Sequence, residues 1–438
     1  MNNCLIGFSK ENITPVNSVI MGGYGHRKGK SIGVHDNIYA HSIYFSFNDI
    51  EFVMVSLDIL GLFNRYVNYF RGLIEKKIGI PKENILIHCV HNHSGPDTIG
   101  LTNIKGFLKK TIKLEIFRPI GNGIIKSILE AKKLANPSKI GANKIDIEKR
   151  LIINRREPLK DSRFQVGVIR IDDLNGNMRG IIINYACHGT VLSSENNEIT
   201  ADYIGYINKW IEEVSDNKVF SIYFNGPCGD INPNLFDFNI KLEDIDKSIL
   251  YDGPRNAKGS FKRAQEIGGS IAKNAWKLAQ NIETKEVKKV NINYKVLYIP
   301  AKNILLNISL KNQLMNLIFI FKLKLFMILR KISNLSNYNF ITKNGVKLKT
   351  EIQVLQINDI IFSTLPGEFF LNLGEKILDK SPSNNTFIIE LANDCAGYFF
   401  SIPDYVEGGY ESILSFCPVG GTYITNQLIN LIKKTNSK

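Results

Sequence analysis

The sequence lacks closely spaced cysteines. Its six cysteines are scattered along 438 residues without a C-x-x-C pair, at Cys4, Cys89, Cys187, Cys228, Cys395 and Cys417. This spacing argues against a disulfide scaffold and against a cysteine-based zinc ribbon. The first residues, MNNCLIGFSKENITP, also lack the basic-then-apolar pattern of a signal peptide. We therefore expect a cytoplasmic protein with reduced thiols.

An uninterrupted apolar run is missing as well. The most apolar stretch is 302–334, and Lys311, Lys322, Lys324 and Arg330 interrupt it. A membrane-crossing helix needs roughly 20 consecutive apolar residues. Two interpretations remain for this stretch. It could form a pair of amphipathic helices packed on the domain, or an interfacial helix whose basic side chains reach back to the membrane surface. The second interpretation would give the protein a peripheral membrane contact.

Basic residues are numerous but not clustered. The formal net charge is +14 and the pI is about 9.3, yet no segment combines a basic cluster with interleaved aromatic residues. Because nucleic-acid binding usually needs such a patch, we expect no nucleic-acid partner. A basic face suits an anionic lipid or an anionic substrate better. The sequence does not predict the oligomeric state.

Strand and helix patterns alternate along the chain. Residues 40–58 predict a hairpin with an Asn-Asp turn, 60–80 a helix that ends near Gly79, and 83–96 a buried strand that leads into a Gly-Pro turn. Asn175-Gly176 predicts a second hairpin. We expect an α/β (α+β) fold with a layered mixed β-sheet core flanked by helices. Because no repeat or linker interrupts the pattern, residues 1–438 are expected to form a single domain.

Three of the seven histidines lie within six positions, at His88, His91 and His93. In a strand, residues i and i+2 share a face, so His91 and His93 should point the same way. His88 should point to the opposite face, where we expect it to pack in the core.

Further polar residues follow other predicted strands. His188 follows the apolar segment RGIIINYAC, and Glu368 follows a strand that ends at Pro366-Gly367. Two imidazoles and a carboxylate would suit zinc if the strands were neighbours. The spacing alone leaves structural histidines, and a Glu placed at a helix N-terminus, as alternatives.

A set of motifs adds a more specific indication. They are FSKENITP, MGGY, GVHDNIYAHSIYF, VSLDILGL, VHNHSGPDT, INRREP, NYACHGTVL, NGPCGDINPN, LPGEFF and AGYFFSIPDYVEGGYES. In this order, over about residues 5–412, they resemble the N-terminal catalytic domain of the neutral/alkaline non-lysosomal ceramidase family. The chain would be a divergent stand-alone member of that family.

The resemblance implies a zinc-dependent amidase that cleaves an N-acyl bond through a zinc-activated water. By matching motifs, the ligands of one Zn²⁺ would be His91, His188, Glu368 and Tyr398. His93 would face the substrate, and Arg155 and Tyr410 would contact the scissile amide and its oxyanion. Gly23 and Asn232 would bind substrate.

The chain departs from the family pattern in three ways. Asn232 occupies the place of a serine often assigned as the nucleophile, and an amide side chain cannot accept an acyl group, so direct hydrolysis is expected. No C-terminal immunoglobulin-like domain is expected, and no secretion signal. The expected substrate is an N-acylated lipid or an N-acylated amino sugar. The alternatives are a ceramidase proper, which would convert N-acylsphingosine to sphingosine and fatty acid, and an inactive binding or scaffold homologue.

Overall fold

The computed structural model describes residues 4–100, 110–147, 151–157, 164–235, 259–300, 340–342, 345–415, 417 and 419–437. The predicted amphipathic segment 302–334 lies outside these residues. Within the described part of the chain, no helix is long and apolar enough to cross a bilayer.

The first sheet is built on the predicted hairpin. Its strands, in the order β5-β4-β3-β1-β6, are β5 (Ile85–Cys89), β4 (Ile50–Leu57), β3 (Tyr39–Phe47), β1 (Leu5–Asn12) and β6 (Asn136–Pro137). The turn between β3 and β4 is tight, and Asn48 adopts a φ of 54° there. Helix α1 (Asn64–Ile78) connects β4 to β5, and these two strands pair in parallel. The helix ends at Gly79, which has a φ of 86°. The hairpin and the helix are therefore confirmed.

The second sheet, like the first, contains a hairpin and a parallel strand pair connected by a helix. Its order is β12-β10-β9-β7-β14, with β12 (Phe220–Asn225), β10 (Met178–Tyr185), β9 (Gln165–Asp172), β7 (Lys139–Asp146) and β14 (Lys285–Glu286). β9 and β10 form the predicted antiparallel hairpin, and α4 (Asp202–Val214) connects β10 to its parallel neighbour β12.

The third sheet has the order β15-β17-β18-β20, and β16 also pairs with β17. The strands are β15 (Val290–Pro300), β16 (Phe340–Thr342), β17 (Gly345–Ile357), β18 (Ile360–Thr364) and β20 (Thr386–Ile389). Three short strand pairs lie outside the large sheets: β2 (Gly33–Val34) with β11 (Glu198–Ile199), β8 (Ile152–Asn154) with β13 (Ile231–Pro233), and β19 (Glu368–Phe369) with β21 (Tyr398–Phe399).

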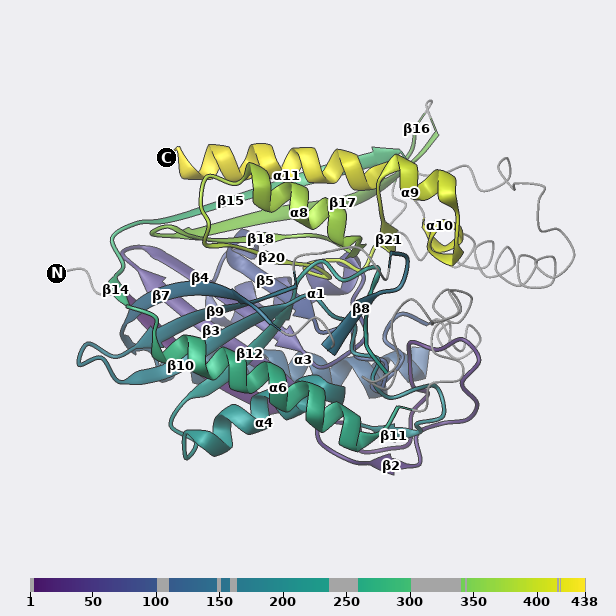
Figure 1. The fold of residues 1–438 in the computed structure, drawn as a ribbon, viewed down its shortest axis with the longest axis horizontal. Helices are drawn as coiled ribbons and strands as arrows, with labels where there is room; N and C mark the ends of the chain where they lie inside the picture. Colours follow the sequence, from purple (N-terminus) through teal and green to yellow (C-terminus); the bar gives the residue numbers. More distant parts are fainter. Residues whose placement is uncertain are drawn as a thin grey trace, which may run out of the picture.

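Helices cover the outer face of each large sheet. α1 and α3 (Lys110–Lys133) pack on the first sheet, α4 and α6 (Phe261–Gln280) on the second, and α8 (Leu371–Lys380) and α11 (Gly420–Asn436) on the third. Figure 1 shows α8 and α11 at the top and α4 and α6 at the bottom, with the sheets between them. The short helices are η1 (Lys82–Asn84), α9 (Ile402–Glu407) and α10 (Tyr410–Leu414).

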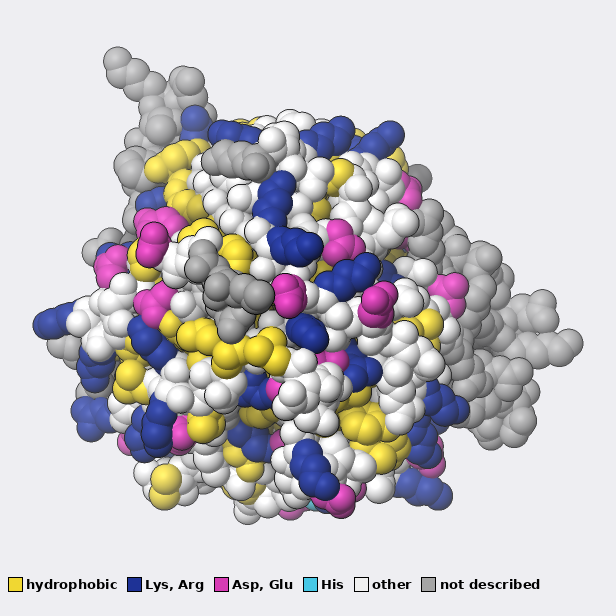
Figure 2. Space-filling model, turned by 90° about the vertical axis from the view of Figure 1, so that its left-hand side faces the viewer, with side chains coloured by type: hydrophobic (Ala, Val, Ile, Leu, Met, Phe, Trp, Pro, Cys, Tyr) yellow, Lys and Arg dark blue, Asp and Glu magenta, His cyan; other side chains and the backbone are white. Residues whose placement is uncertain are grey.

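The inner faces of the three sheets share one apolar core. It includes Ile6 and Phe52 from the first sheet, Ile182 from the second, and Phe362 and Phe387 from the third, all buried. The predicted layered α/β fold is confirmed. On the face drawn in Figure 2, Lys and Arg side chains lie scattered among acidic and apolar ones.

Candidate metal centre

Four predicted ligands come from four chain segments that end at one place. His91 lies just after β5 and His188 just after β10, while Glu368 and Tyr398 pair across β19 and β21. Backbone hydrogen bonds join these segments. Asn92, the residue after His91, forms a β-bridge with Gly189, the residue after His188. The structure therefore brings together residues that lie up to 307 positions apart, between His91 and Tyr398.

The two imidazoles converge on one carboxylate oxygen. His91 Nε2 and His188 Nε2 each lie 3.2 Å from Oε2 of Glu368. Two ligands at about 2.0–2.1 Å from a tetrahedral zinc ion lie about 3.3 Å from each other. The spacing of these donor atoms therefore fits a shared metal ion.

Hydrogen bonds on the far side of each ring fix the tautomer. His91 Nδ1 lies 2.8 Å from the carbonyl oxygen of Leu60, and His188 Nδ1 lies 3.0 Å from that of Ile231. A carbonyl can only accept, so each Nδ1 carries a proton. In a neutral ring, Nε2 then presents a lone pair toward Glu368. Facing lone pairs need a cation or a proton between them, and this arrangement is typical of metal-binding histidines.

Tyr398 completes the set of predicted ligands. Its side chain is buried and hydrogen-bonds Glu368, and burial together with that carboxylate raises the pKa of Tyr398 well above its usual value. Burial also opposes ionisation of Glu368, but positive charge on the facing imidazoles outweighs this effect and holds the pKa of Glu368 well below its usual value, and a cation shared by the three groups would act in the same direction. The carboxylate is thus held in the charged form that a metal ion binds.

His93 lies beside the same centre. Its ring centroid is 4.8 Å from that of His91 and 6.0 Å from that of His188. Both ring nitrogens are shielded from solvent and have no hydrogen-bond partner. The donor atoms of the three histidines lie within 4.8 Å of one another, so His93 is also placed where it could reach a metal ion or a water beside it.

Gly23 packs against the His93 ring. Its φ is +96°, and a Cβ at this position would lie 2.4 Å from the imidazole. Only glycine combines this conformation with such a close approach. The structure therefore places Gly23 under His93, and its predicted contact with substrate stays a prediction.

The backbone of the histidine segment differs from the prediction. β5 ends at Cys89, and His91 has a φ of 58°, so His91 and His93 lie in a turn and not on a strand face. The strands β5 and β10 belong to different sheets, so His91 and His188 meet although their strands are not neighbours.

His88 is buried as predicted. Its ring lies 3.0 Å from the Ser56 hydroxyl and accepts from the Asn225 N–H at 3.2 Å. Burial lowers the pKa of His88 to about 3, so the ring is neutral. These bonds satisfy the imidazole away from the metal centre.

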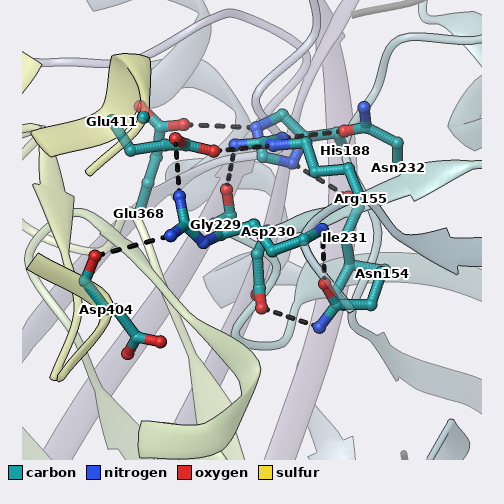
Figure 3. A network of polar contacts seen from close by, with 12 residues as sticks. Asn154, Arg155, His188, Gly229, Asp230, Ile231, Asn232, Glu368, Asp404 and Glu411 are labelled. Carbon is teal, nitrogen blue, oxygen red and sulfur yellow. Dashed lines mark hydrogen bonds and ion pairs between the residues drawn. The ribbon is translucent and has the colours of Figure 1, made fainter. Parts of the chain in front are cut away.

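Arg155 is held in a clamp next to the centre (Figure 3). It donates to Glu411 at 3.0 Å, to the Asn232 side-chain oxygen at 2.9 Å and to the Gly229 carbonyl. The guanidinium also lies 5.8 Å from the ring centroid of Tyr398 and 5.1 Å from that of Tyr410. All the predicted catalytic residues therefore surround the predicted metal ligands.

Two buried carboxylates were not predicted. Glu411 binds both Arg155 and Arg156, and Asp230 accepts from the Leu371 N–H and the Asn154 amide at 2.8 Å each. Asp230 thereby connects the start of α8 to β8 and lies two residues before Asn232 of β13. In the sequence, only the adjacent Arg155 and Arg156 pointed to such a carboxylate. If both arginines are buried, they need an acidic partner, but their positions do not say which residue supplies it.

Comparisons with known proteins indicate the family of the chain. A family model described as the N-terminal part of neutral/alkaline non-lysosomal ceramidase matches residues 4–316. The chain is 26% identical over 286 residues to the neutral ceramidase of Pseudomonas aeruginosa, and the match covers 60% of this chain and 42% of that protein. It is 26% identical over 242 residues to neutral ceramidase B of Dictyostelium discoideum, with 48% and 33% covered.

The fold matches a solved structure as well. The crystal structure of the Pseudomonas aeruginosa neutral ceramidase aligns with a TM-score of 0.73 at 18% identity, over 98% of this chain and 74% of that one. The sequence matches span less than half the length of the two curated relatives named above. Since the family model covers most of the residues, the chain belongs to the neutral/alkaline non-lysosomal ceramidase family.

Proposed function

We propose that the protein is a zinc-dependent amidohydrolase that cleaves an N-acyl bond in an N-acylated lipid or amino sugar. The observation that carries the proposal is the convergence of His91 and His188 on one oxygen of Glu368. With Tyr398 they would hold one zinc ion, which supplies Lewis-acid catalysis by polarising a carbonyl and acidifying water.

The residues around this centre suit amide hydrolysis. In the proposal, His93 accepts the proton of the attacking water and passes it to the leaving amine. It can do so because neither of its ring nitrogens has another partner. Burial lowers the pKa of His93 well below its usual value, so the ring is neutral before the reaction.

Arg155 and Tyr410 would stabilise the oxyanion that forms on the amide carbonyl. Arg155 cannot turn freely, because Glu411, Asn232 and Gly229 hold its three nitrogens. A fixed positive charge needs no reorganisation as negative charge develops on the substrate. The side-chain oxygen of Asn232 accepts one of these hydrogen bonds from Arg155. This contact favours a role for Asn232 in orienting Arg155 and in binding substrate.

A ceramidase proper is the second candidate. It is favoured by the similarity to the two relatives named above, which are neutral ceramidases. Hydrolysis of an N-acylsphingosine should be compared with that of short N-acyl amino sugars. Activity on polar substrates alone would exclude the ceramidase.

The test of the proposal is hydrolysis by purified protein and by Glu368→Gln. The variant keeps the size of the side chain but removes the charge that two imidazoles face. We expect amide hydrolysis by the wild type and a loss of at least about 100-fold in the variant. Equal activity in both, or binding of the amide without hydrolysis by the zinc-loaded wild type, would contradict the proposal, and the second result would favour the inactive binding homologue.

A further inference from the structure

Arg27 lies on the loop that leads from Gly23 past the metal centre. Its Nη1 donates to the Gly22 carbonyl at 2.9 Å and to the His93 carbonyl at 2.7 Å. These two bonds fix the position and the plane of the guanidinium. Its charge therefore sits directly against the backbone of His93.

The other edge of the same guanidinium has no acceptor. Nε and Nη2 of Arg27 are both shielded from solvent, and neither has a hydrogen-bond partner. Burial lowers the pKa of Arg27, which indicates that water does not solvate the charge well. Buried donors of this kind are costly unless a partner accepts from them.

The free edge has the geometry of a carboxylate receptor. Nε–H and one Nη2–H are parallel donors along one edge of the planar guanidinium, and they match the two oxygens of a carboxylate. Within the described ranges, no acidic side chain forms an ion pair with Arg27. This distinguishes it from Arg155, whose charge Glu411 balances.

Ring contacts connect the Arg27 guanidinium to the residues of the metal centre. The Arg27 guanidinium lies 5.0 Å from the centroid of the Tyr24 ring, and the Tyr24 ring lies 5.0 Å from that of His93. The His93 ring in turn lies 4.8 Å from that of His91. Because Nη1 also contacts the His93 carbonyl at 2.7 Å, a group bound at Arg27 would lie close to His93.

We propose that Arg27 recognises a carboxylate on the substrate, and that the substrate class is N-acyl amino acids. This inference rests on the proposed function. Water would add its oxygen to the acyl carbon, the C–N bond would break, and the amine would take the proton. The products would be a fatty acid and an amino acid, whose carboxylate Arg27 holds throughout.

The test compares two substrates that differ only in the terminal group of the amine half. N-lauroylglycine carries a carboxylate where N-lauroylethanolamine carries a hydroxymethyl group. We expect kcat/KM of the wild type to be at least about 10-fold higher for the glycine conjugate. Arg27→Gln should lose about 10- to 100-fold more activity on N-lauroylglycine than on N-lauroylethanolamine.

Two further variants separate recognition from support of the loop. Arg27→Lys keeps the positive charge but loses the two parallel N–H donors. Its activity on N-lauroylglycine should therefore fall between those of the wild type and Arg27→Gln. Lys28→Gln removes a neighbouring exposed charge and should behave as the wild type does. An equal loss on both substrates in Arg27→Gln would mean that Arg27 only supports His93, and would overturn the inference. A wild type that prefers the uncharged substrate would also overturn it.

A binding measurement keeps the inference apart from the proposed function. If neither substrate were hydrolysed, the proposed function would fail, and calorimetry would still test Arg27. Binding of N-lauroylglycine at least about 10-fold more tightly by the wild type than by Arg27→Gln would support the carboxylate site. Equal affinity would overturn it.

Discussion

At the scale of single residues, the site depends on buried groups whose partners are fixed. His91 and His188 each donate from Nδ1 to a backbone carbonyl, which leaves Nε2 free to face Glu368. Asp58 shows the opposite situation, because its environment is poor in partners. One oxygen accepts from the Tyr39 N–H at 2.8 Å, and the other has no hydrogen bond.

Asp58 should make stability depend on pH. Burial raises its pKa to about 7, and the nearby His41 is neutral because burial lowers its pKa to about 3. The folded state thus binds the Asp58 proton more tightly than the unfolded state does. The contribution to stability is full below about pH 4 and is lost as the pH rises through about 7.

Asp58→Asn should remove this part of the pH dependence. We expect the variant to gain about 2–4 kcal/mol relative to the wild type between about pH 4 and pH 8. Urea unfolding at a series of pH values measures the difference, with the exposed Asp49→Asn as the control. If the free energies of unfolding of the wild type and Asp58→Asn changed with pH in parallel, ionisation of Asp58 would cost the folded state little free energy.

At the scale of elements, most of the helices and hairpins could be predicted from the sequence. The periodicity of 60–80 and the Asn175-Gly176 turn reflect local preferences, so they are readable without knowledge of the rest of the chain. The left-handed turn at His91 was not predictable, because it is coupled to the β-bridge between Asn92 and Gly189, a residue that follows a strand of another sheet. The ligand set followed from family motifs, not from periodicity. Glu411 and Arg27 gave no comparable pattern, because their roles depend on contacts between distant segments.

The loop that contains Gly23 and Gly25 offers a prediction at this scale. In Gly23→Ala, the new Cβ would lie 2.4 Å from the His93 ring, at a φ of +96°. We expect hydrolysis to fall at least about 10-fold as His93 is displaced, with a loss of only about 1–3 kcal/mol of stability. Gly25→Ala is the matched control, because nothing lies within 4 Å of its Cβ position. Similar activities of the two variants would argue against a role for the close packing of Gly23.

At the scale of the whole molecule, a buried ion pair links the first sheet layer to the third. Arg71 on α1 contacts Glu351 on β17 at 2.5 Å, and both side chains are almost fully buried. Arg71 also donates to the Ile85 carbonyl at 2.9 Å, and Glu351 accepts from the Tyr294 hydroxyl at 2.9 Å. The pair therefore joins α1, β5, β15 and β17. The extent of the domain over 1–438 stays a prediction.

Breaking this pair should be far more costly than breaking an exposed one. Arg71→Met leaves the Glu351 carboxylate buried without its charged partner, so we expect a loss of about 3–5 kcal/mol. Lys82→Ala breaks the pair with Glu75, in which both side chains are more than 40% exposed, and should cost less than about 1 kcal/mol. Denaturant unfolding measures both. Equal losses would mean that the buried pair does not hold the layers together.

The metal content of the purified protein tests the central claim most directly. Elemental mass spectrometry of the wild type, after incubation with zinc and removal of the excess, should find about one zinc ion per chain. His91→Ala should lose the metal, while Asn232→Ala should keep it, because Asn232 contacts Arg155 and not the ligands. A wild type that retains no zinc, or a His91→Ala variant that retains as much as the wild type, would contradict the account.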